Sequence, residues 1–356
     1  MVMGFDQILQ VKQKLNSPVL IIGHTGFKGT WLTLLLEKLG VESVGISLPA
    51  DTTSMYSKLN RHGRINEYFE DIRNTTKMEN LFQKIKPKYV FHFAAQPLVL
   101  NSYKVPRETF ETNVMGTVNV LDAATKLDMC EHIVVATTDK VYRNDDSGNR
   151  FTENFALGGK DPYSWSKVGT ESAISAWQQI SLVTGGPKIT SVRAGNVIGG
   201  GDQAENRLLP DLIRSFISNS EIPLRNPQST RPWQHALDPL WGYLLALTSD
   251  SSEPAFNFSP EGKSLKVLEV ANISMKTWGT SLKIIIEEQQ IGLESNMLEL
   301  NSALAKEKLH WKSSWSQENA VVSTVSWWKS VAEKKLTPEE ACNINLEELF
   351  EETNNA

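Results

Sequence analysis

Cysteine is scarce in this sequence, and its scarcity excludes several kinds of protein. The 356 residues include two cysteines, Cys130 and Cys342, and neither lies in a pattern with the ligand spacing of a zinc site. A disulfide scaffold is excluded too, since such scaffolds are dense in cysteine. We therefore expect no metal site, and we expect a reducing, cytoplasmic setting.

Excess basic charge and long apolar runs are also missing. Lys and Arg total 36 against 41 Asp and Glu, a formal net charge of −5, whereas a nucleic-acid-binding protein usually has a basic face. The start, Met-Val-Met-Gly-Phe-Asp, lacks the basic and then apolar regions of a secretory signal. No apolar run approaches the length that spans a bilayer. We expect neither a nucleic-acid nor a membrane partner.

Apolar strand-like runs alternate with helical segments up to about residue 195. This alternation predicts an α/β fold with a doubly wound parallel sheet. Because the chain is longer than one core usually serves, we expect a smaller second lobe. The predicted division is a Rossmann-type dinucleotide-binding domain at 1–195, with segments near 230–260 returning to it, a substrate-binding lobe at 196–340, and an acidic tail at 341–356 that either frays or packs late.

A glycine-rich turn joins the first predicted strand to the helix after it. Val19–Ile22, an apolar run that fits a strand buried on both faces, leads into Gly23-His24-Thr25-Gly26-Phe27-Lys28-Gly29. In a dinucleotide site the first glycine allows a tight turn, the second lets the backbone approach a pyrophosphate, and the third lets helix and strand pack closely. The helix N-terminus then attracts the phosphates. The spacing differs from the standard Gly-x-Gly-x-x-Gly, so a turn without a ligand is the alternative.

The residue that would distinguish NAD from its phosphorylated form is not evident. Most NAD-binding folds end the second strand with Asp or Glu, which holds the ribose 2′-hydroxyl. Here that strand ends near Ser47, and Asp51 follows a few residues later. Arg61, Arg64 and Lys28 are candidates for a 2′-phosphate, and each fits a solvated surface charge equally well. The residues leave NAD and NADP both open.

Further cofactor contacts are predicted where later strands end. Asp71 follows a β-like run and can accept a hydrogen bond from the adenine amino group. The strand at 89–95 ends in small residues, which leave room for a ligand, and the helix predicted over 107–127 carries Asn113. The predicted cofactor-binding set is Gly23, Thr25, Gly26, Phe27, Lys28, Gly29, Asp71, Ile72, Ala94, Ala95, Gln96, Asn113, Tyr163 and Lys167.

A tyrosine and a lysine carry the predicted chemistry. Tyr163 and Lys167 start a helix predicted over 163–180, and their spacing puts both on one helix face. A phenol has an ordinary pKa of about 10, and a nearby ammonium group favours the phenolate. Beside a nicotinamide ring, the pair can take the proton of a sugar hydroxyl while hydride leaves the same carbon. Two surface residues of an amphipathic helix are the alternative.

A polar cluster ends the strand before that helix. Thr138 can hydrogen-bond the same hydroxyl, Asp139 is a candidate acid, and Lys140 is a candidate charge or base. We expect the cluster to face Tyr163 across the cofactor. An ordinary strand-end turn is the alternative.

Several segments together resemble one family. They are Gly-His-Thr-Gly-Phe-Lys-Gly at 23–29, Ala-Ala-Gln-Pro-Leu-Val at 94–99, Thr-Asn-Val-Met-Gly-Thr-Val-Asn at 112–119, Thr-Thr-Asp-Lys-Val-Tyr at 137–142, Asp-Pro-Tyr-Ser-x-Ser-Lys at 161–167, Arg-Ala-Gly-Asn-Val-Ile-Gly-Gly-Gly-Asp at 193–202 and Arg-Pro-Trp-Gln-His at 231–235. With them the chain resembles the extended short-chain dehydrogenase/reductases, most closely the CDP-glucose 4,6-dehydratases, over nearly its whole length. Lys140 is a specific mark, since related dehydratases usually carry Glu there.

The resemblance implies NAD as cofactor and a full reaction cycle on a nucleotide sugar. Tyr163 removes the proton of the 4-hydroxyl as hydride passes from C4 to NAD. Loss of the C5 proton and of the 6-hydroxyl as water, helped by Asp139, gives an enone. NADH then returns hydride to C6, and C5 is reprotonated. The 4-keto-6-deoxy product belongs to an early step towards deoxysugars of a surface polysaccharide. Lys140 stands where other dehydratases have the C5 base, and whether it is a neutral base or stabilises the enolate stays open.

The resemblance also implies a substrate site and a dimer. Guanidinium groups at the second lobe suit the nucleotide diphosphate, Trp233 can stack on the base or close the site, and His235 is either a contact or a core histidine. The predicted substrate-binding set is Gln96, Asn196, Arg207, Arg231, Trp233 and His235. The implied partners are CDP-glucose and a second copy of the chain, in a homodimer or dimer of dimers paired through the helices 107–127 and 163–180.

Some positions depart from the family pattern. Leu100 replaces a basic residue, Gln203 replaces an aromatic one, and 288–294 lack a histidine-containing loop. All lie where substrate is expected. Two other functions remain as alternatives: an epimerase or reductase, which needs the same turn and tyrosine–lysine pair but no acid for water loss, and a non-catalytic cofactor-binding protein on the same fold.

Overall fold

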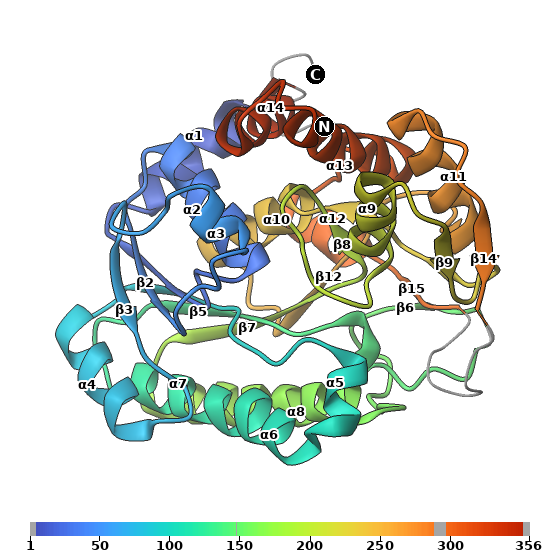
Figure 1. Cartoon of the computed structure of the whole chain (residues 1–356). Coiled ribbons are helices and arrows are strands. Elements are labelled where there is room, and N and C mark those ends of the chain that lie inside the picture. Colours follow the sequence, from blue (N-terminus) through green and yellow to red (C-terminus); the bar gives the residue numbers. More distant parts are fainter. Residues whose placement is uncertain (1–4, 147, 288–296, 352–356) are drawn as a thin grey trace.

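The computed structural model describes residues 5–146, 148–287 and 297–351. A seven-stranded sheet forms its centre (Figure 1), with the order β12-β7-β5-β4-β1-β2-β3 and every pairing parallel. The strands are β1 (Val19–Ile22), β2 (Ser43–Ser47), β3 (Asn66–Phe69), β4 (Tyr89–His92), β5 (His132–Ala136), β7 (Lys188–Ala194) and β12 (Ala255–Phe258). The predicted doubly wound α/β fold is confirmed. The edge strand β12 is a segment beyond residue 195 that belongs to this sheet.

The four residues of β1 are all apolar because both faces of the strand are covered. Val19 and Ile21 pack into the core on one face of the sheet, and Leu20 and Ile22 pack into the core on the other, because successive side chains of a strand point to opposite faces. All four are 0% exposed. The run therefore has no polar face, as a strand covered on both sides requires.

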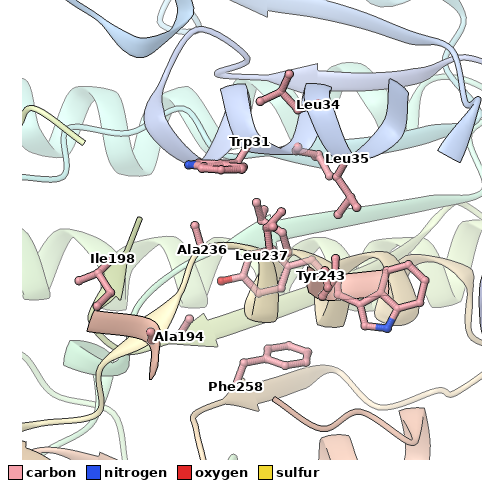
Figure 2. Close-up of a cluster of buried hydrophobic side chains, with 14 of the residues drawn as sticks. Trp31, Leu34, Leu35, Ala194, Ile198, Ala236, Leu237, Tyr243 and Phe258 are labelled. Atoms are coloured by element: carbon pink, nitrogen blue, oxygen red, sulfur yellow. The ribbon is translucent and has the colours of Figure 1, made fainter. Parts of the chain in front are cut away.

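Helices cover both faces of the sheet (Figure 1). One face carries α1 (Phe5–Lys14), α2 (Phe27–Leu39) and α10 (Leu237–Thr248), and the other carries α4 (Thr75–Ile85), α7 (Gly116–Thr125) and α8 (Pro162–Thr184). Figure 2 shows Trp31 and Leu35 of α2 lying toward Leu237 and Tyr243 of α10. This packing ties the N-terminal turn to a helix from the second half of the chain.

Short elements connect the larger ones around the sheet. They are α3 (Met55–Lys58), α5 (Val99–Lys104), α6 (Pro106–Phe110), the π-helical turn η1 (Glu111–Met115), the 3₁₀ turn η2 (Asp139–Val141) and β6 (Arg150–Phe151). The helix predicted over 107–127 is thus α6, η1 and α7 in succession.

The second lobe consists of helices and small two-stranded sheets. Its elements are β8 (Val197–Ile198), α9 (Leu208–Ser218), β9 (Ile222–Leu224), β10 (Thr230–Arg231), β11 (Gln234–His235), β13 (Leu265–Lys266), α11 (Val267–Trp278), β14 (Ile284–Ile286), β15 (Glu299–Leu300), α12 (Ala303–Leu309) and α13 (Gln317–Ala332). The pairs are β10 with β13, β11 with β8, β14 with β9, and β15 with β6. The departure from the family pattern at 288–294 lies outside the described residues.

The acidic tail does not fray over its described part. Residues Pro338–Glu351 form the helix α14, which lies beside α13 (Figure 1). Leu346 and Leu349 are 1% and 0% exposed, and both belong to the main core. Their spacing on the helix gives the tail an apolar face, which the count of acidic residues conceals.

Neither a membrane span nor a metal centre is found in the part of the chain that the structure describes. No helix there is long and apolar enough to cross a bilayer. No group of three or more His, Cys, Asp or Glu side chains there is arranged to hold a metal ion. Cys130 and Cys342 are both free and buried.

Candidate active site

The glycine-rich turn lies at the end of β1, between β2 and β4, where the strand order reverses. Doubly wound sheets bind ligands in the crevice at this point. Gly23 has a φ of +93°, and a Cβ on it would lie 2.6 Å from the backbone nitrogen of Ala94. A Cβ on Gly29 would collide with the carbonyl of Gly23, whereas the nearest atom to a Cβ on Gly26 is that carbonyl oxygen at 3.3 Å. Gly23 and Gly29 thus permit the tight turn and the close packing, and Gly26 leaves the approach to the turn open.

Positive charge and free backbone donors surround this approach. Gly26 is the N-cap of α2 and supplies no side-chain cap, so the first amides of the helix are available to an anion. The Lys28 Nζ lies 3.5 Å from the Tyr243 hydroxyl, on the side of the turn that faces α10. Burial, and then repulsion by Lys167 and Arg207, lower the pKa of Lys28 to about 8. These cations and amides fit the pyrophosphate of a dinucleotide.

The end of β2 carries hydroxyl groups in place of a carboxylate. The Thr25 Oγ1 lies 2.7 Å from the Ser47 Oγ and donates to the Leu48 carbonyl at 3.0 Å. Asp71, expected at the adenine, pairs with Arg73 through contacts of 2.7 to 3.1 Å. The hydrogen bond with Arg73 is the main reason why the pKa of Asp71 is lowered. The adjacent Ile72 is 4% exposed and packs against Gly116.

Two of the three basic residues that could bind a 2′-phosphate pair with glutamate side chains instead. Arg61 is 1% exposed and pairs with Glu37. Arg64 pairs with Glu339 of α14 at 2.8 Å. Neither guanidinium group lies ready to bind a 2′-phosphate, which favours the unphosphorylated cofactor.

Asn113 joins the end of β4 to the catalytic helix. Its Oδ1 accepts from the Gln96 backbone N–H at 2.8 Å, and its Nδ2 donates to the Gln96 carbonyl at 3.1 Å and to the Ser166 Oγ at 2.8 Å. Asn113 lies in η1, and such π-turns are frequent at functional sites. The loop that carries Ala94 and Ala95 is thereby fixed against α8.

Helix α8 presents Tyr163 and Lys167 at its first two turns. Asp161 caps the helix by accepting from the Ser164 N–H at 2.8 Å, and the Ser164 side chain returns the bond in a capping box. The backbone N–H of Tyr163 donates to the Ser102 Oγ at 3.0 Å. The start of α8 is thus anchored on two sides, which fixes the position of the phenol.

Burial of Tyr163 opposes the expected phenolate. Burial raises the pKa of Tyr163 to about 12, and a hydrogen bond with Thr138 opposes this rise. Burial also lowers the pKa of Lys167 to about 8, with the charge of Glu171 acting the other way. The Lys167 Nζ donates to the Ala136 carbonyl at 3.1 Å, and the charges that act on the pKa of Tyr163 are those of Asp139, Arg207 and Asp161. Burial therefore favours the neutral phenol over the phenolate at Tyr163.

Thr138, Asp139 and Tyr163 come together at the end of β5. The Thr138 Oγ1 donates to the Asp139 Oδ1 at 3.0 Å, and Thr138 also hydrogen-bonds Tyr163. Asp139 is 1% exposed, and its Oδ2 has no partner among the described residues. The Lys140 Nζ lies 3.9 Å from the Asp139 Oδ1. A buried carboxyl oxygen without a partner is costly, and it is suited to a hydrogen bond with a ligand.

The predicted substrate residues separate into two groups. The Arg207 guanidinium pairs with Asp202 at 3.1 Å, and its charge acts on both Tyr163 and Lys28, so it faces the site. Asn196, in the segment 193–202, is half-buried, and its carbonyl accepts from the Gln234 N–H at 3.0 Å.

Arg231, Trp233 and His235 lie deeper than expected, at 6%, 4% and 0% exposure. His235 packs between Trp31 and Trp315, with ring centroids 5.8 and 4.4 Å away, and burial lowers its pKa to about 3. The structure therefore favours the core alternative for His235. The Trp233 Nε1 donates to the Leu265 carbonyl at 3.2 Å, so this side chain also packs in the protein interior and not against a base.

Several residues at the site were not predicted from sequence. They are Ser102, Ser166, Glu171, Arg193 as a partner of Glu171, and Tyr243. Glu171 has one signal, its position four residues beyond Lys167 on the same helix face. The others are brought in by long-range packing.

Known proteins are similar to this chain in sequence. A family model described as GDP-mannose 4,6 dehydratase matches residues 20–324. The CDP-glucose 4,6-dehydratase of Salmonella typhimurium is 38% identical over 324 residues, which cover 88% of this chain and 90% of that protein. A UDP-glucose 4-epimerase of Pisum sativum is 24% identical over 345 residues, which cover 88% of this chain and 96% of the epimerase.

A solved structure of similar fold is the dTDP-glucose 4,6-dehydratase DesIV from Streptomyces venezuelae, with NAD and TYD bound. Its TM-score is 0.77 at 21% identity, over 88% of this chain and 97% of that one. At this identity the likeness shows a common fold.

Proposed function

The chain belongs to the family described as GDP-mannose 4,6 dehydratase, and we propose that it converts CDP-D-glucose to CDP-4-dehydro-6-deoxy-D-glucose and water. The proposed cofactor is NAD. The 38% identity to the Salmonella CDP-glucose 4,6-dehydratase supports the nucleotide. The observation that carries the chemistry is the meeting of Tyr163 and Asp139 at the end of β5, where the Asp139 Oδ2 has no partner among the described residues.

The glycine turn and its surroundings fit NAD. Gly23, Gly26 and Gly29 would hold its pyrophosphate at the start of α2, with Lys28 as a nearby cation. Thr25 and Ser47 would hold the adenosine ribose, where other folds use an acidic side chain. Bound NAD supplies an acceptor for the hydrogen removed from the sugar and a donor that returns it.

Tyr163 is the base that takes the proton of the sugar 4-hydroxyl. To do so, Tyr163 must first release its own proton to solvent. Burial opposes this release by raising the pKa of Tyr163 to about 12, and the hydrogen bond with Thr138 and the charge of Arg207 favour it. Thr138 hydrogen-bonds Tyr163 and orients the phenol oxygen toward the sugar. Lys167 supplies the nearby positive charge that stabilises the phenolate while it exists.

Asp139 is the acid that protonates the departing 6-hydroxyl. Burial at 1% exposure removes competing water from its carboxyl group. Lys140 lies beside it, with its Nζ 3.9 Å from the Asp139 Oδ1. There it either removes the C5 proton as a neutral amine or stabilises the enolate that forms when this proton leaves. Arg207, which faces the same site, would bind the substrate diphosphate.

An epimerase is the second candidate. It needs the same turn and the same tyrosine–lysine pair, and the pea UDP-glucose 4-epimerase is 24% identical. A buried acid next to the base has no task in simple epimerisation, however, and Asp139 therefore favours the dehydratase.

We also propose a homodimer in a cytoplasmic setting. Tyr103, Phe110, Met115 and Trp165 are between 41% and 53% exposed. They come from α5, α6, η1 and α8, which form the outer layer at the bottom of Figure 1. Large apolar side chains exposed on helices that pack together suit an interface. The two free, buried cysteines suit a reducing compartment.

A substrate panel tests the function. The purified protein with NAD is incubated in turn with CDP-, dTDP-, UDP- and GDP-hexoses, and products are analysed by mass spectrometry. We expect CDP-glucose to lose the mass of one water and to give the ultraviolet absorbance of a 4-keto sugar in alkali. Conversion of another nucleotide sugar in its place would correct the substrate. No loss of water from any of the four would reject the dehydratase.

A further inference from the structure

A buried ion pair contacts the end of β5, next to Thr138 and Asp139. Glu171 and Arg193 are 3% and 5% exposed. The Arg193 Nη2 lies 2.7 Å from the Glu171 Oε2, and the Arg193 Nε donates to the Glu171 Oε1 at 2.8 Å. This two-point contact fixes the orientation of both side chains. It joins α8 to β7, the two elements that flank the end of β5.

Glu171 continues the row of reacting side chains along α8. Tyr163, Lys167 and Glu171 follow one another at intervals of four residues, so they share one face of the helix. The end of β5 meets each of them in turn. The Ala136 carbonyl accepts from Lys167 at 3.1 Å, Thr137 donates its hydroxyl to the Glu171 Oε1 at 2.5 Å, and Thr138 hydrogen-bonds Tyr163.

The carboxylate of Glu171 is held in its ionised form. Besides Arg193 and Thr137, it accepts from the Ser191 hydroxyl at 2.6 Å. Burial opposes ionisation, but the charge of Arg193 and these hydrogen bonds outweigh it and lower the pKa of Glu171. Arg193 is in turn anchored by the Tyr142 hydroxyl at 2.8 Å and the Glu153 carbonyl at 3.1 Å. The pair is thus a fixed element of the fold.

Several other groups face Lys167. Lys28 from the glycine turn is near enough for the charge of Lys167 to lower the pKa of Lys28. His92 of β4 is close enough to feel Lys167, but burial holds the pKa of His92 at about 3 and it stays neutral. Burial favours the neutral phenol at Tyr163 as well, and the contact on β5 is the uncharged Ala136 carbonyl. Glu171 is the negative charge that favours the ammonium form of Lys167.

We propose that Glu171, held by Arg193, is a positioning residue for the dehydration: it keeps Lys167 charged and fixes the strand end that carries Thr138 and Asp139. This inference builds on the proposed function. Glu171 acts through Lys167 and Thr137 and touches neither sugar nor cofactor.

The test uses two single variants with opposite expected effects. Glu171→Gln keeps the size of the side chain and leaves the Arg193 cation unbalanced, so Lys167 loses its proton at lower pH. We expect the alkaline limb of the kcat–pH profile to move down by about one pH unit. We also expect kcat at neutral pH to fall by roughly ten- to a hundredfold through misplacement. Arg193→Gln removes the cation but keeps the hydroxyl groups of Thr137 and Ser191 on the carboxylate. Glu171 then favours the Lys167 ammonium more strongly, and the alkaline limb moves up.

The controls separate charge from structure. Glu171→Gln/Arg193→Gln removes both charges, and its alkaline limb should return close to that of the wild type. Glu131→Gln removes a carboxylate at the opposite end of the sheet, where it pairs with Lys88, and should leave the profile unchanged. The pKa of Lys167 is also measured without turnover, from the ¹³Cε signal of labelled lysine, assigned with Lys167→Arg.

The outcomes are distinct from those of the substrate panel. If the wild type converts no sugar nucleotide, the proposed function fails, and the lysine titration still tests the positioning of Lys167. If the wild type is active but the single variants that fold share its alkaline limb and its Lys167 pKa, Glu171 is only a structural residue. Opposite shifts in the two variants, or the expected shift in the one that folds, support the inference.

Discussion

Replacing Tyr163 with phenylalanine should lower kcat on CDP-glucose by about 10³-fold, within the range that a positioned acid–base group contributes. The substitution removes one oxygen and nothing else. The helix keeps its cap at Asp161 and its bond from the Tyr163 N–H to Ser102, because both involve groups that phenylalanine shares. NAD affinity and thermal stability should therefore stay close to those of the wild type.

The matched control is Tyr68→Phe, the same chemical change on β3, away from the site. The measurement is steady-state turnover with NAD binding followed in parallel. A Tyr163→Phe protein that retains more than about a tenth of wild-type kcat would remove Tyr163 from the role of base, since loss of a general base rarely costs so little.

Asp139→Asn should separate the two halves of the reaction. The amide keeps the size of the carboxyl group and can still accept from the Thr138 hydroxyl, a contact of 3.0 Å in the wild type. It has no acidic proton for the departing 6-hydroxyl. We expect formation of the 4-keto-6-deoxy product to fall by about 10²- to 10⁴-fold, while oxidation at C4 continues and reduced cofactor accumulates.

Rapid mixing with absorbance at the reduced nicotinamide band follows the first step, and mass spectrometry follows the second. Asp122→Asn, at a surface carboxylate paired with Lys126 on α7, controls for the change of charge. Wild-type rates of water loss from Asp139→Asn would show that another group is the acid. Loss of both steps together would mean that Asp139 serves the oxidation as well.

Much of the fold was predictable because its signals are local. The four apolar residues Val19–Ile22, the glycines after them and the helix that follows lie within one stretch of sequence, and each follows from backbone geometry or strand burial. The tyrosine–lysine pair is likewise local, since a spacing of four residues places two side chains on one helix face.

Other features depend on partners distant in the sequence. From the sequence alone, Arg64 fits a solvated surface charge. In the structure it pairs with Glu339 of α14, which is 275 positions away in the chain. From the sequence alone, His235 is a candidate substrate contact. In the structure it packs between Trp31 and Trp315. Neither partner is visible from local pattern, because tertiary packing decides which polar residue is buried.

The protonation of the site is a third kind of information. The sequence places an ammonium group four residues from Tyr163 and so suggests a phenolate. The structure buries both groups, and desolvation raises the pKa of Tyr163 to about 12 and lowers that of Lys167 to about 8. Charge and burial act in opposite directions, and burial is known only once the fold is known.

The most direct test of the account is to follow a deuterium label placed at C4 of CDP-glucose. If Tyr163 and Asp139 act on one sugar ring, the product will have lost one water and will carry the deuterium at C6. A product that has kept its water, with the deuterium still at C4 or lost to solvent, would contradict the account.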